Sequence, residues 1–246
     1  MKRISGTRLL LVIAGGILAM ISGVVAAGII RTRHTVDALQ HLKQLGGEVH
    51  LACPHWCPVI VSRNASTFMA NQVQLEFVGI ETPLLYIAMQ IKRLPQDVCL
   101  SLQDVSLTNV DLRQLCELKN VVALSVTDLG MSDQAIKSIV KMSQLKCLSI
   151  HGGQVTDRGC QYLSGHGQLE HLGLIGLPIS DSGVRELSKL SHLKIVDLRG
   201  THVTDLGLRH LVTLPDLQSI DLRNSQVTAQ GVRRFRETRP GIEIQN

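Results

Sequence analysis

The chain of 246 residues has very few aromatic side chains: one Trp, two Tyr and three Phe, or 2% of the sequence. Because 44% of the residues are hydrophobic, a large core is still possible, and it must consist mainly of Leu, Val and Ile. Such a core favours regular, layered packing over an irregular, pocketed one. The scarcity of rings also disfavours nucleic acid as a partner despite a net charge of +5, because bases stack on aromatic side chains.

The sequence also lacks recognisable catalytic motifs. It contains no G-x-S-x-G, no H-E-x-x-H, no glycine-rich phosphate-binding loop and no paired C-x-x-C. Its six cysteines are scattered and too few for a disulfide-dense secreted scaffold. We therefore expect no enzyme activity, no cofactor and no metal site.

Two cysteines lie close together, in the stretch Cys53-Pro-His-Trp-Cys57, and three interpretations of it are open. A zinc site would need a fourth ligand besides Cys53, His55 and Cys57. Redox activity is typical of cysteines separated by two residues, whereas three separate these. A local disulfide, or packing around Trp56, fits an exported domain best.

Charged residues are absent from Leu9–Ile30, which follows a basic tail of residues 1–8. As a helix, this stretch would be about 33 Å long and would span a lipid bilayer. The flanking basic residues favour a cytoplasmic N-terminus and an extracytoplasmic remainder. The alternative is a signal peptide cleaved after Ala27, but the apolar stretch extends beyond a usual signal core, and we favour an uncleaved anchor.

Small residues recur at every fourth position of this apolar stretch. As a helix, it would present them as one stripe through which two membrane helices can approach closely. This pattern predicts a possible homodimer through the membrane helix. The small residues are Gly15, Ala19, Gly23 and Ala27.

A 24-residue pattern repeats six times without insertion over residues 97–240. Apolar residues at the fourth and sixth positions of each unit predict a short strand. Later in each unit, a Ser or Thr is predicted to cap a short helix, and an Asp follows it in four units, where the positive end of the helix favours an acid. The predicted caps are Thr108, Ser132, Thr156, Ser180, Thr204 and Thr228. Four glycines are predicted to let the helices approach their neighbours: Gly159, Gly183, Gly207 and Gly231.

Units such as "LKIVDLRGTHVTDLGLRHLVTLPD" (Leu193–Asp216) resemble leucine-rich repeats of the T-D-x-G-L kind, which occur in many bacterial proteins. They are also similar to the cysteine-containing repeats of F-box substrate receptors, although no F-box occurs in the rest of the sequence. The resemblance implies an α/β leucine-rich repeat solenoid, with a parallel concave β-sheet and short convex helices. The apolar stretch described above would precede this solenoid as one transmembrane helix. The resemblance also implies a protein-binding scaffold.

Residues 31–96 are predicted to link the anchor to the repeats and to cover the first end of the solenoid. Thr35–Gly47 reads as a short amphipathic helix and Glu48–Leu51 as a strand. Val73–Gln96 fits a degenerate seventh unit, although Glu76 and Pro83 violate the pattern. We expect residues 241–246 to form a C-terminal tail.

Outward-facing columns of the concave sheet are the candidate binding surface. One predicted column is Ser101, Ser125, Ser149, Gly173, Asp197 and Asp221, and the next is Gln103, Thr127, His151, Ile175, Arg199 and Arg223. The residues hypothesised to bind a partner are Asp197, Arg199, Asp221, Arg223, His151, Gln103 and Thr127. The alternative for the repeated D-L-R pattern is a ladder of ion pairs that neutralise one another.

Two further groups of residues are candidate sites. Cys147, His151 and His171 share the predicted face, but without a carboxylate they make a poor metal site. The last predicted helix carries a basic cluster that either contacts lipid phosphates or an acidic polymer, or is simply solvated. That cluster consists of Arg233, Arg234, Arg236 and Arg239.

These features predict a membrane-anchored protein that binds an unknown protein partner through its concave sheet, without catalysis. The lipid bilayer is a second expected partner, through Leu9–Ile30. The alternatives are a structural, self-associating envelope protein, an analogue of F-box substrate receptors, and an enzyme whose site has no recognisable motif.

Overall fold

The computed structural model describes residues 37–50, 72–79 and 84–246. Within these ranges, nine strands form a single sheet in sequence order. They are β1 (Gly47–His50), β2 (Gln72–Val78), β3 (Asp97–Gln103), β4 (Val121–Thr127), β5 (Cys147–His151), β6 (His171–Ile175), β7 (Ile195–Asp197), β8 (Ser219–Asp221) and β9 (Glu243–Gln245). β1 is antiparallel to β2, and every later pair is parallel.

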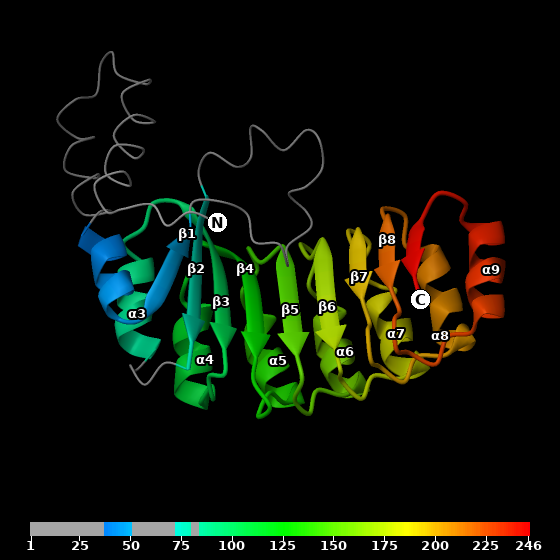
Figure 1. Cartoon of the computed structure of the whole chain (residues 1–246), viewed down its shortest axis with the longest axis horizontal. Helices are drawn as coiled ribbons and strands as arrows, with labels where there is room; N and C mark the ends of the chain where they lie inside the picture. The colour runs from blue at the N-terminus through cyan, green and yellow to red at the C-terminus, as the bar shows by residue number, and fades with distance from the viewer. Residues whose placement is uncertain (1–36, 51–71, 80–83) are drawn as a thin grey trace, which may run out of the picture.

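Each strand from β2 to β8 is followed by a helix, and the helices lie along one face of the sheet (Figure 1). They are α3 (Leu84–Ile91), α4 (Asn109–Cys116), α5 (Asp133–Ile139), α6 (Asp157–Leu163), α7 (Asp181–Leu187), α8 (Asp205–His210), which continues into the 3₁₀ turn η3 (Leu211–Thr213), and α9 (Ala229–Thr238). The six predicted strand–helix pairs are therefore confirmed as β3 to β8 and α4 to α9. β2 and α3 provide the degenerate seventh pair.

The two ends of the array differ in how well the sequence predicted them. A helix over residues 37–44 and strand β1 agree with the predicted cover of the first end. At the other end, the stretch assigned to a tail contains β9, which pairs with β8. Ile244 lies opposite Ile220, 24 residues earlier, and is buried in the same way. The tail assignment missed this last turn of the repeat.

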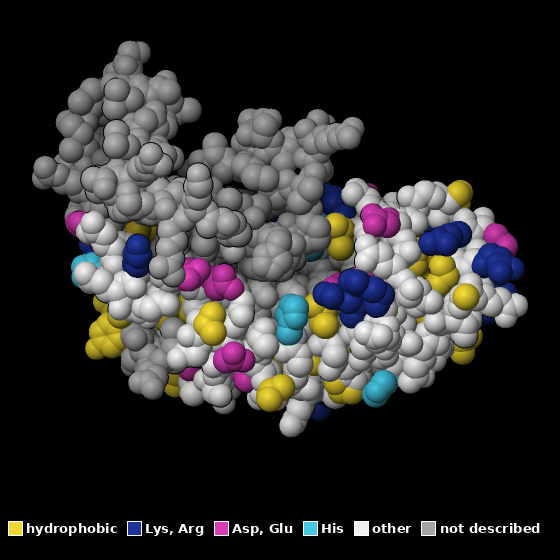
Figure 2. Space-filling model, viewed as in Figure 1, with side chains coloured by type: hydrophobic (Ala, Val, Ile, Leu, Met, Phe, Trp, Pro, Cys, Tyr) yellow, Lys and Arg dark blue, Asp and Glu magenta, His cyan; other side chains and the backbone are white. Residues whose placement is uncertain are grey.

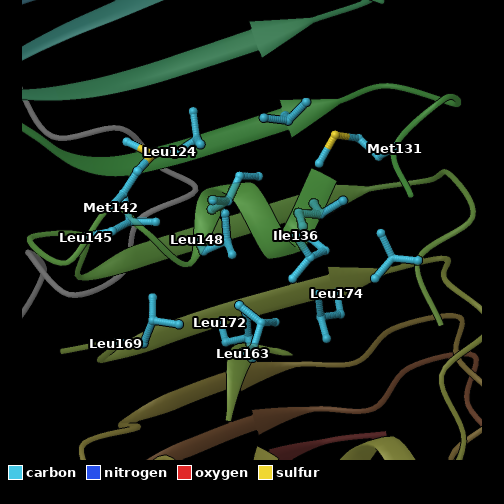
Figure 3. Packing of buried hydrophobic residues seen from close by; sticks show 14 of the residues in the cluster. Leu124, Met131, Ile136, Met142, Leu145, Leu148, Leu163, Leu169, Leu172 and Leu174 are labelled. Atoms are coloured by element: carbon cyan, nitrogen blue, oxygen red, sulfur yellow. The ribbon is translucent and has the colours of Figure 1, made fainter. Parts of the chain in front are cut away.

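The core lies between the sheet and the helices and is almost entirely aliphatic. In each unit the fourth and sixth positions, such as Leu148 and Ile150 in β5, are no more than 1% exposed. Leu163 of α6 packs into the same layer from the helix side (Figure 3). One unit cannot bury these side chains alone, so burial depends on stacking against neighbours.

At four joints of the array, one Asp carboxylate connects a unit to the next one. Asp181, for example, accepts hydrogen bonds from both the backbone N–H (2.8 Å) and the hydroxyl (2.6 Å) of Thr204, the cap of the following helix. The Thr204 hydroxyl then accepts a hydrogen bond from the N–H of Leu206 in the first turn of α8. The same arrangement links Asp133 to Thr156, Asp157 to Ser180 and Asp205 to Thr228. We call these four links the aspartate ladder.

The aspartate ladder gives the T-D pair a larger role than the sequence predicted. Each Asp begins its own helix, as expected from the helix dipole, and the same carboxylate also fixes the cap one unit later. The carboxylate accepts a hydrogen bond from the hydroxyl of the cap residue. The lone pairs of that hydroxyl oxygen therefore remain free to accept a hydrogen bond from a backbone N–H of the helix. One side chain therefore serves two helices.

The repeated glycine makes room for the carboxylate of the preceding unit. A β-carbon at Gly207 would overlap the Asp181 carboxylate, and one at Gly231 would overlap that of Asp205. The prediction that these glycines allow close approach is right, but the group that approaches is a carboxylate rather than a turn of backbone. Asp and the next unit's Gly therefore form one structural requirement.

The first two repeat units show what happens without this Asp–Gly combination. Leu85 occupies the Asp position before Thr108, and the Gly position carries Asp111, whose carboxylate accepts the N–H and hydroxyl of Thr108 within one unit. At the next joint, Asn109 and Ala135 replace Asp and Gly, and the cap Ser132 makes no side-chain capping bond. The capping bond is missing at the joint that lacks the carboxylate.

We predict that Gly207→Ala lowers the free energy of unfolding by about 1–3 kcal/mol, although alanine is the better helix former. The added methyl group must push Asp181 away from Thr204. Urea unfolding followed by circular dichroism measures the effect. Gly165→Ala is the matched control, because no atom lies within 4 Å of its new β-carbon. Equal stability of the two variants would contradict the role given to Gly207.

A second prediction is that the missing step of the aspartate ladder can be built. Asn109→Asp together with Ala135→Gly supplies both the carboxylate and its space, so Ser132 should gain the two bonds that Thr156 makes. Each single substitution should be neutral or destabilising, and the double variant should show a favourable coupling of about 1 kcal/mol or more. A double-mutant cycle of urea unfolding measures this term, and simple additivity would refute it.

Candidate functional site

The sheet register places the predicted outward-facing residues in rows. The first column is continuous across the sheet and is longer than predicted, since β2 and β9 extend it. It runs through Glu76, Ser101, Ser125, Ser149, Gly173, Asp197, Asp221 and Gln245. Gln103, Thr127, His151 and Ile175 form the second column, while Arg199 and Arg223 follow the ends of β7 and β8.

A hollow of about 370 Å³ lies on this face over β5 to β9. Ser149, His171, Asp197, Asp221 and Gln245 are among the residues that line it. The serines at the start of the first column are buried, whereas Asp197 and Asp221 are only half-buried. Apart from Glu76 on β2, which is also half-buried, the accessible polar groups of the column therefore lie in its C-terminal half.

The four charged residues of the D-L-R pattern are brought together by ion pairs. Arg199 donates its Nε and Nη2 to Asp197 at 2.9 and 2.7 Å, and Arg223 donates to Asp221 at 3.0 and 2.6 Å. The Nε of Arg199 also lies 3.4 Å from Asp221, which joins the two pairs. The hydrogen bonds that Arg199 donates to the Asp197 carboxylate raise the pKa of Arg199.

These ion pairs fix the side chains more than they stabilise the fold. The Arg199 side chain is 36% exposed and that of Arg223 is 50% exposed, and ion pairs so open to solvent add little to stability. The geometry of the self-neutralising ladder is therefore present. It does not prevent binding, because pairs fixed before contact lose less side-chain freedom on binding.

The other three predicted binding residues lie in different surroundings. His151 is coupled to Asp197 and Arg199 through their charges and lies beside the charged group. Gln103 donates a hydrogen bond to Glu76, the residue that violated the repeat pattern, and lies with Thr127 on β3 and β4. The structure therefore groups five of the seven predicted residues and leaves Gln103 and Thr127 apart.

Ser149 and His151 make a contact on this face that has the form of a nucleophile and a base. Ser149 Oγ and His151 Nε2 are 3.0 Å apart, and a β-carbon at Gly173 would overlap this hydroxyl. Burial lowers the pKa of His151, so its imidazole is neutral near pH 7. Among the described residues, however, no carboxylate is hydrogen-bonded to His151, and the orienting third member of a catalytic triad has no counterpart.

His171 is buried against the floor of the hollow, and burial lowers its pKa from 6.5 to about 4. Glu170 opposes this shift and Lys194 adds to it. Its Nδ1 atom has no hydrogen-bond partner among the described residues. His171 therefore remains neutral inside the sheet face and serves packing.

The predicted basic cluster on α9 is divided between structure and surface. Arg239 donates to the carbonyl groups of Val212 and Leu214, and Arg236 donates to that of Ile244. Both side chains satisfy backbone acceptors near the end of the array. Arg233 and Arg234 remain exposed, so the basic surface is smaller than the sequence suggested.

Neither of the two other special features of the sequence falls within the described ranges. Cys53–Cys57 and Leu9–Ile30 lie outside residues 37–50, 72–79 and 84–246. Within those residues, no group of three or more His, Cys, Asp or Glu side chains is placed to hold a metal ion. None of the helices described there combines the length and the apolar character that crossing a membrane requires.

Comparison with known proteins identifies the architecture. A family model described as leucine-rich repeat matches residues 189–212, the length of one unit. The fold is a leucine-rich repeat solenoid. No curated protein matches the chain significantly.

Among solved structures, the leucine-rich repeat solenoid resembles bacterial internalins. The crystal structure of an internalin (inlF) from Listeria monocytogenes has 17% sequence identity and a TM-score of 0.50, covering 72% of this chain and 47% of that one. The chain thus spans about half the length of that internalin. Internalin C2 of the same species has 17% identity and a TM-score of 0.45, covering 66% of this chain and 76% of its own. At this identity, the first likeness establishes the fold alone.

The pKa of His171 gives a testable dependence of stability on pH. Between pH 6.5 and about 4, the folded chain binds fewer protons at His171 than the unfolded chain, so stability falls as the pH is lowered through this window. We predict that His171→Ile, which copies the equivalent Ile195, reduces the stability lost between pH 7 and 4.5 by on the order of 2 kcal/mol. Urea unfolding at both pH values measures the difference.

The control for this prediction is Ile195→Val, which changes the side chain next to His171 on β7 without adding or removing a titratable group. Its pH dependence should follow the wild type. If His171→Ile also followed the wild-type curve, the histidine would not be buried in its neutral form.

Proposed function

We propose that this leucine-rich repeat protein is a non-catalytic binding protein that holds another protein on its concave sheet. The hollow over β5 to β9 is the observation that carries this proposal. It lies on the face that repeat solenoids use as an extended binding surface. The charged group formed by Asp197, Arg199, Asp221 and Arg223 borders it and would supply specificity.

The charges favour a partner with its own alternating charges. Asp197 and Asp221 lie side by side in the register, and each is paired with an arginine two residues later. A partner carboxylate would meet the outer guanidinium groups, while a partner cation would meet Asp221 or Glu243. Such complementary charges contribute to specificity and association rate more than to raw affinity.

We further propose that Leu9–Ile30 anchors the protein in a membrane and that the repeats lie on the extracytoplasmic side. The support is the uncharged, apolar sequence and its basic flanks. Anchoring would also strengthen a modest contact, because neighbouring copies in the same membrane engage a partner together. The alternative remains a structural envelope protein whose solenoids bind each other.

Chemical crosslinking in intact membranes tests the binding surface. The informative variant replaces the four charges by neutral residues of similar shape: Asp197→Asn, Arg199→Gln, Asp221→Asn and Arg223→Gln. We expect a crosslinked protein to be recovered with the wild type and reduced roughly tenfold or more in the variant, a loss of about 1.4 kcal/mol in binding. Mass spectrometry identifies and quantifies the partner.

The matched control neutralises an ion pair on the convex side, with Glu186→Gln and Lys189→Gln. In the wild type, Glu186 Oε2 and Lys189 Nζ are 2.6 Å apart. This control should capture as much partner as the wild type. Undiminished capture by the four-residue variant would show that these charges do not form the binding surface. Recovery of only the chain itself would favour the self-associating alternative.

A further inference from the structure

Helix α3 is apolar on its exposed face as well as on its buried one. Leu84, Ile87, Ala88 and Ile91 pack into the core, as in any helix of the array. On the other side, Leu85, Tyr86 and Met89 are 46%, 56% and 54% exposed. Figure 2 shows hydrophobic side chains, in yellow, gathered over this helix. A solvated helix normally carries polar residues there.

The equivalent positions in later helices show that the fold does not require this apolar surface. In α5 they are Asp133, Gln134 and Lys137, and in α7 they are Asp181, Ser182 and Arg185. The exposed apolar surface continues onto α4, which packs against α3 and carries Val110, 51% exposed, at the position of Tyr86. In α8 that position holds a lone apolar residue, Leu206, which is 60% exposed. We call Leu85, Tyr86, Met89 and Val110 the α3 patch.

The α3 patch lies at the end of the array where the described chain begins. The helix over residues 37–44 and α3 belong to the same core cluster and lie at the same end in Figure 1. Only residues 31–36 separate the apolar stretch Leu9–Ile30 from Asp37. Six residues reach at most about 20 Å when extended, so an anchor in Leu9–Ile30 would hold this end of the solenoid close to the bilayer surface.

The side chains of the α3 patch and its surroundings suit the headgroup region of a membrane. Tyrosine is enriched at that depth because its ring is apolar and its hydroxyl is polar. Lys92 and Arg93 follow α3 directly, and both are exposed, although Lys92 is paired with Glu117 at 2.7 Å, so that among the described residues Arg93 carries the unneutralised charge. Apolar side chains beside basic ones are typical of helices that lie in the plane of an interface rather than crossing it.

From these observations we infer that the α3 patch lies in the headgroup region of the bilayer that anchors the chain. This inference rests on the membrane anchor proposed above. Because α3 is on the helical face of the solenoid, contact there turns the concave sheet away from the lipid. The membrane contact would therefore leave the hollow and its charged border open to a partner.

Photolabelling of the full chain in vesicles tests this contact. The vesicles contain phosphatidylcholine, phosphatidylglycerol and a phospholipid with a diazirine near its headgroup, and mass spectrometry locates the labels after irradiation. We expect peptides from α3 to be labelled roughly fivefold or more above peptides from α8, at the far end. The α8 peptide is a fair control because Leu206 is 60% exposed and apolar.

The matched variant gives the α3 patch the polar residues that later units carry, with Leu85→Asn, Tyr86→Gln and Met89→Lys. It should lose the α3 label while keeping the label on Leu9–Ile30. Label on Leu9–Ile30 but none on α3 in the wild type would overturn the inference and leave the anchor intact. No label on either segment would overturn the anchor itself.

Two other results of the same experiment would also overturn the inference. Equal labelling of α3 and α8 would show nonspecific collision with lipid. Crosslinks from α3 to a second copy of the chain, in place of lipid, would make the patch a contact between proteins.

Discussion

The bond from a cap residue to the aspartate of the preceding unit is the interaction on which the regularity of this solenoid depends. It satisfies the backbone N–H and the hydroxyl of the cap at once, and it leaves the cap oxygen able to hold the next helix. The aliphatic core would allow units of somewhat different length, because burial of apolar surface has no direction. Hydrogen bonds of 2.5–2.8 Å do not allow this freedom. Across the four joints of the aspartate ladder, the 24-residue spacing thus follows from polar geometry as well as from packing.

The same regularity creates the candidate binding surface. Strands held in strict register place chemically similar residues side by side, so Asp197 faces Asp221 and their arginines can join the two pairs. A slip of one residue would turn these carboxylates into the core. The arrangement of side chains on this face therefore depends on bonds made on the opposite side of the molecule. The sheet provides a regular surface, and any specificity of that surface comes from the side chains that differ from strand to strand along its outward columns.

Most of the fold could be predicted from the sequence, because six copies of one pattern reinforce each other. Strand positions, caps and glycines all followed from it, and the two outward columns were placed correctly as far as the strands extend. The ladder itself was missed, since a T-D pair is already explained by capping and the helix dipole, and spacing does not reveal a bond to the next unit. The simultaneous replacement of Asp by Asn109 and of the next unit's Gly by Ala135 was a sequence feature that indicated this bond. β9 was missed although Ile244 continues the period, because a strand of three residues shows too little of the 24-residue pattern by itself.

In the candidate site, the ion pairs could be anticipated from the D-L-R pattern. The hydrogen bond from Gln103 to Glu76 could not, because it joins a predicted residue to one that violates the repeat pattern.

In the aspartate ladder, every carboxylate accepts hydrogen bonds from a residue that lies later in the chain. Asp133 is complete as part of α5 before Thr156 exists, held by the positive end of its own helix. A ribosome makes the chain in that same order, and the earlier part of a protein folds first. Each new unit therefore emerges next to an acceptor that is already in place, and no cap has to wait unsatisfied for a later segment. When the array grows from its first end, each new unit therefore docks onto a unit whose carboxylate is already in position.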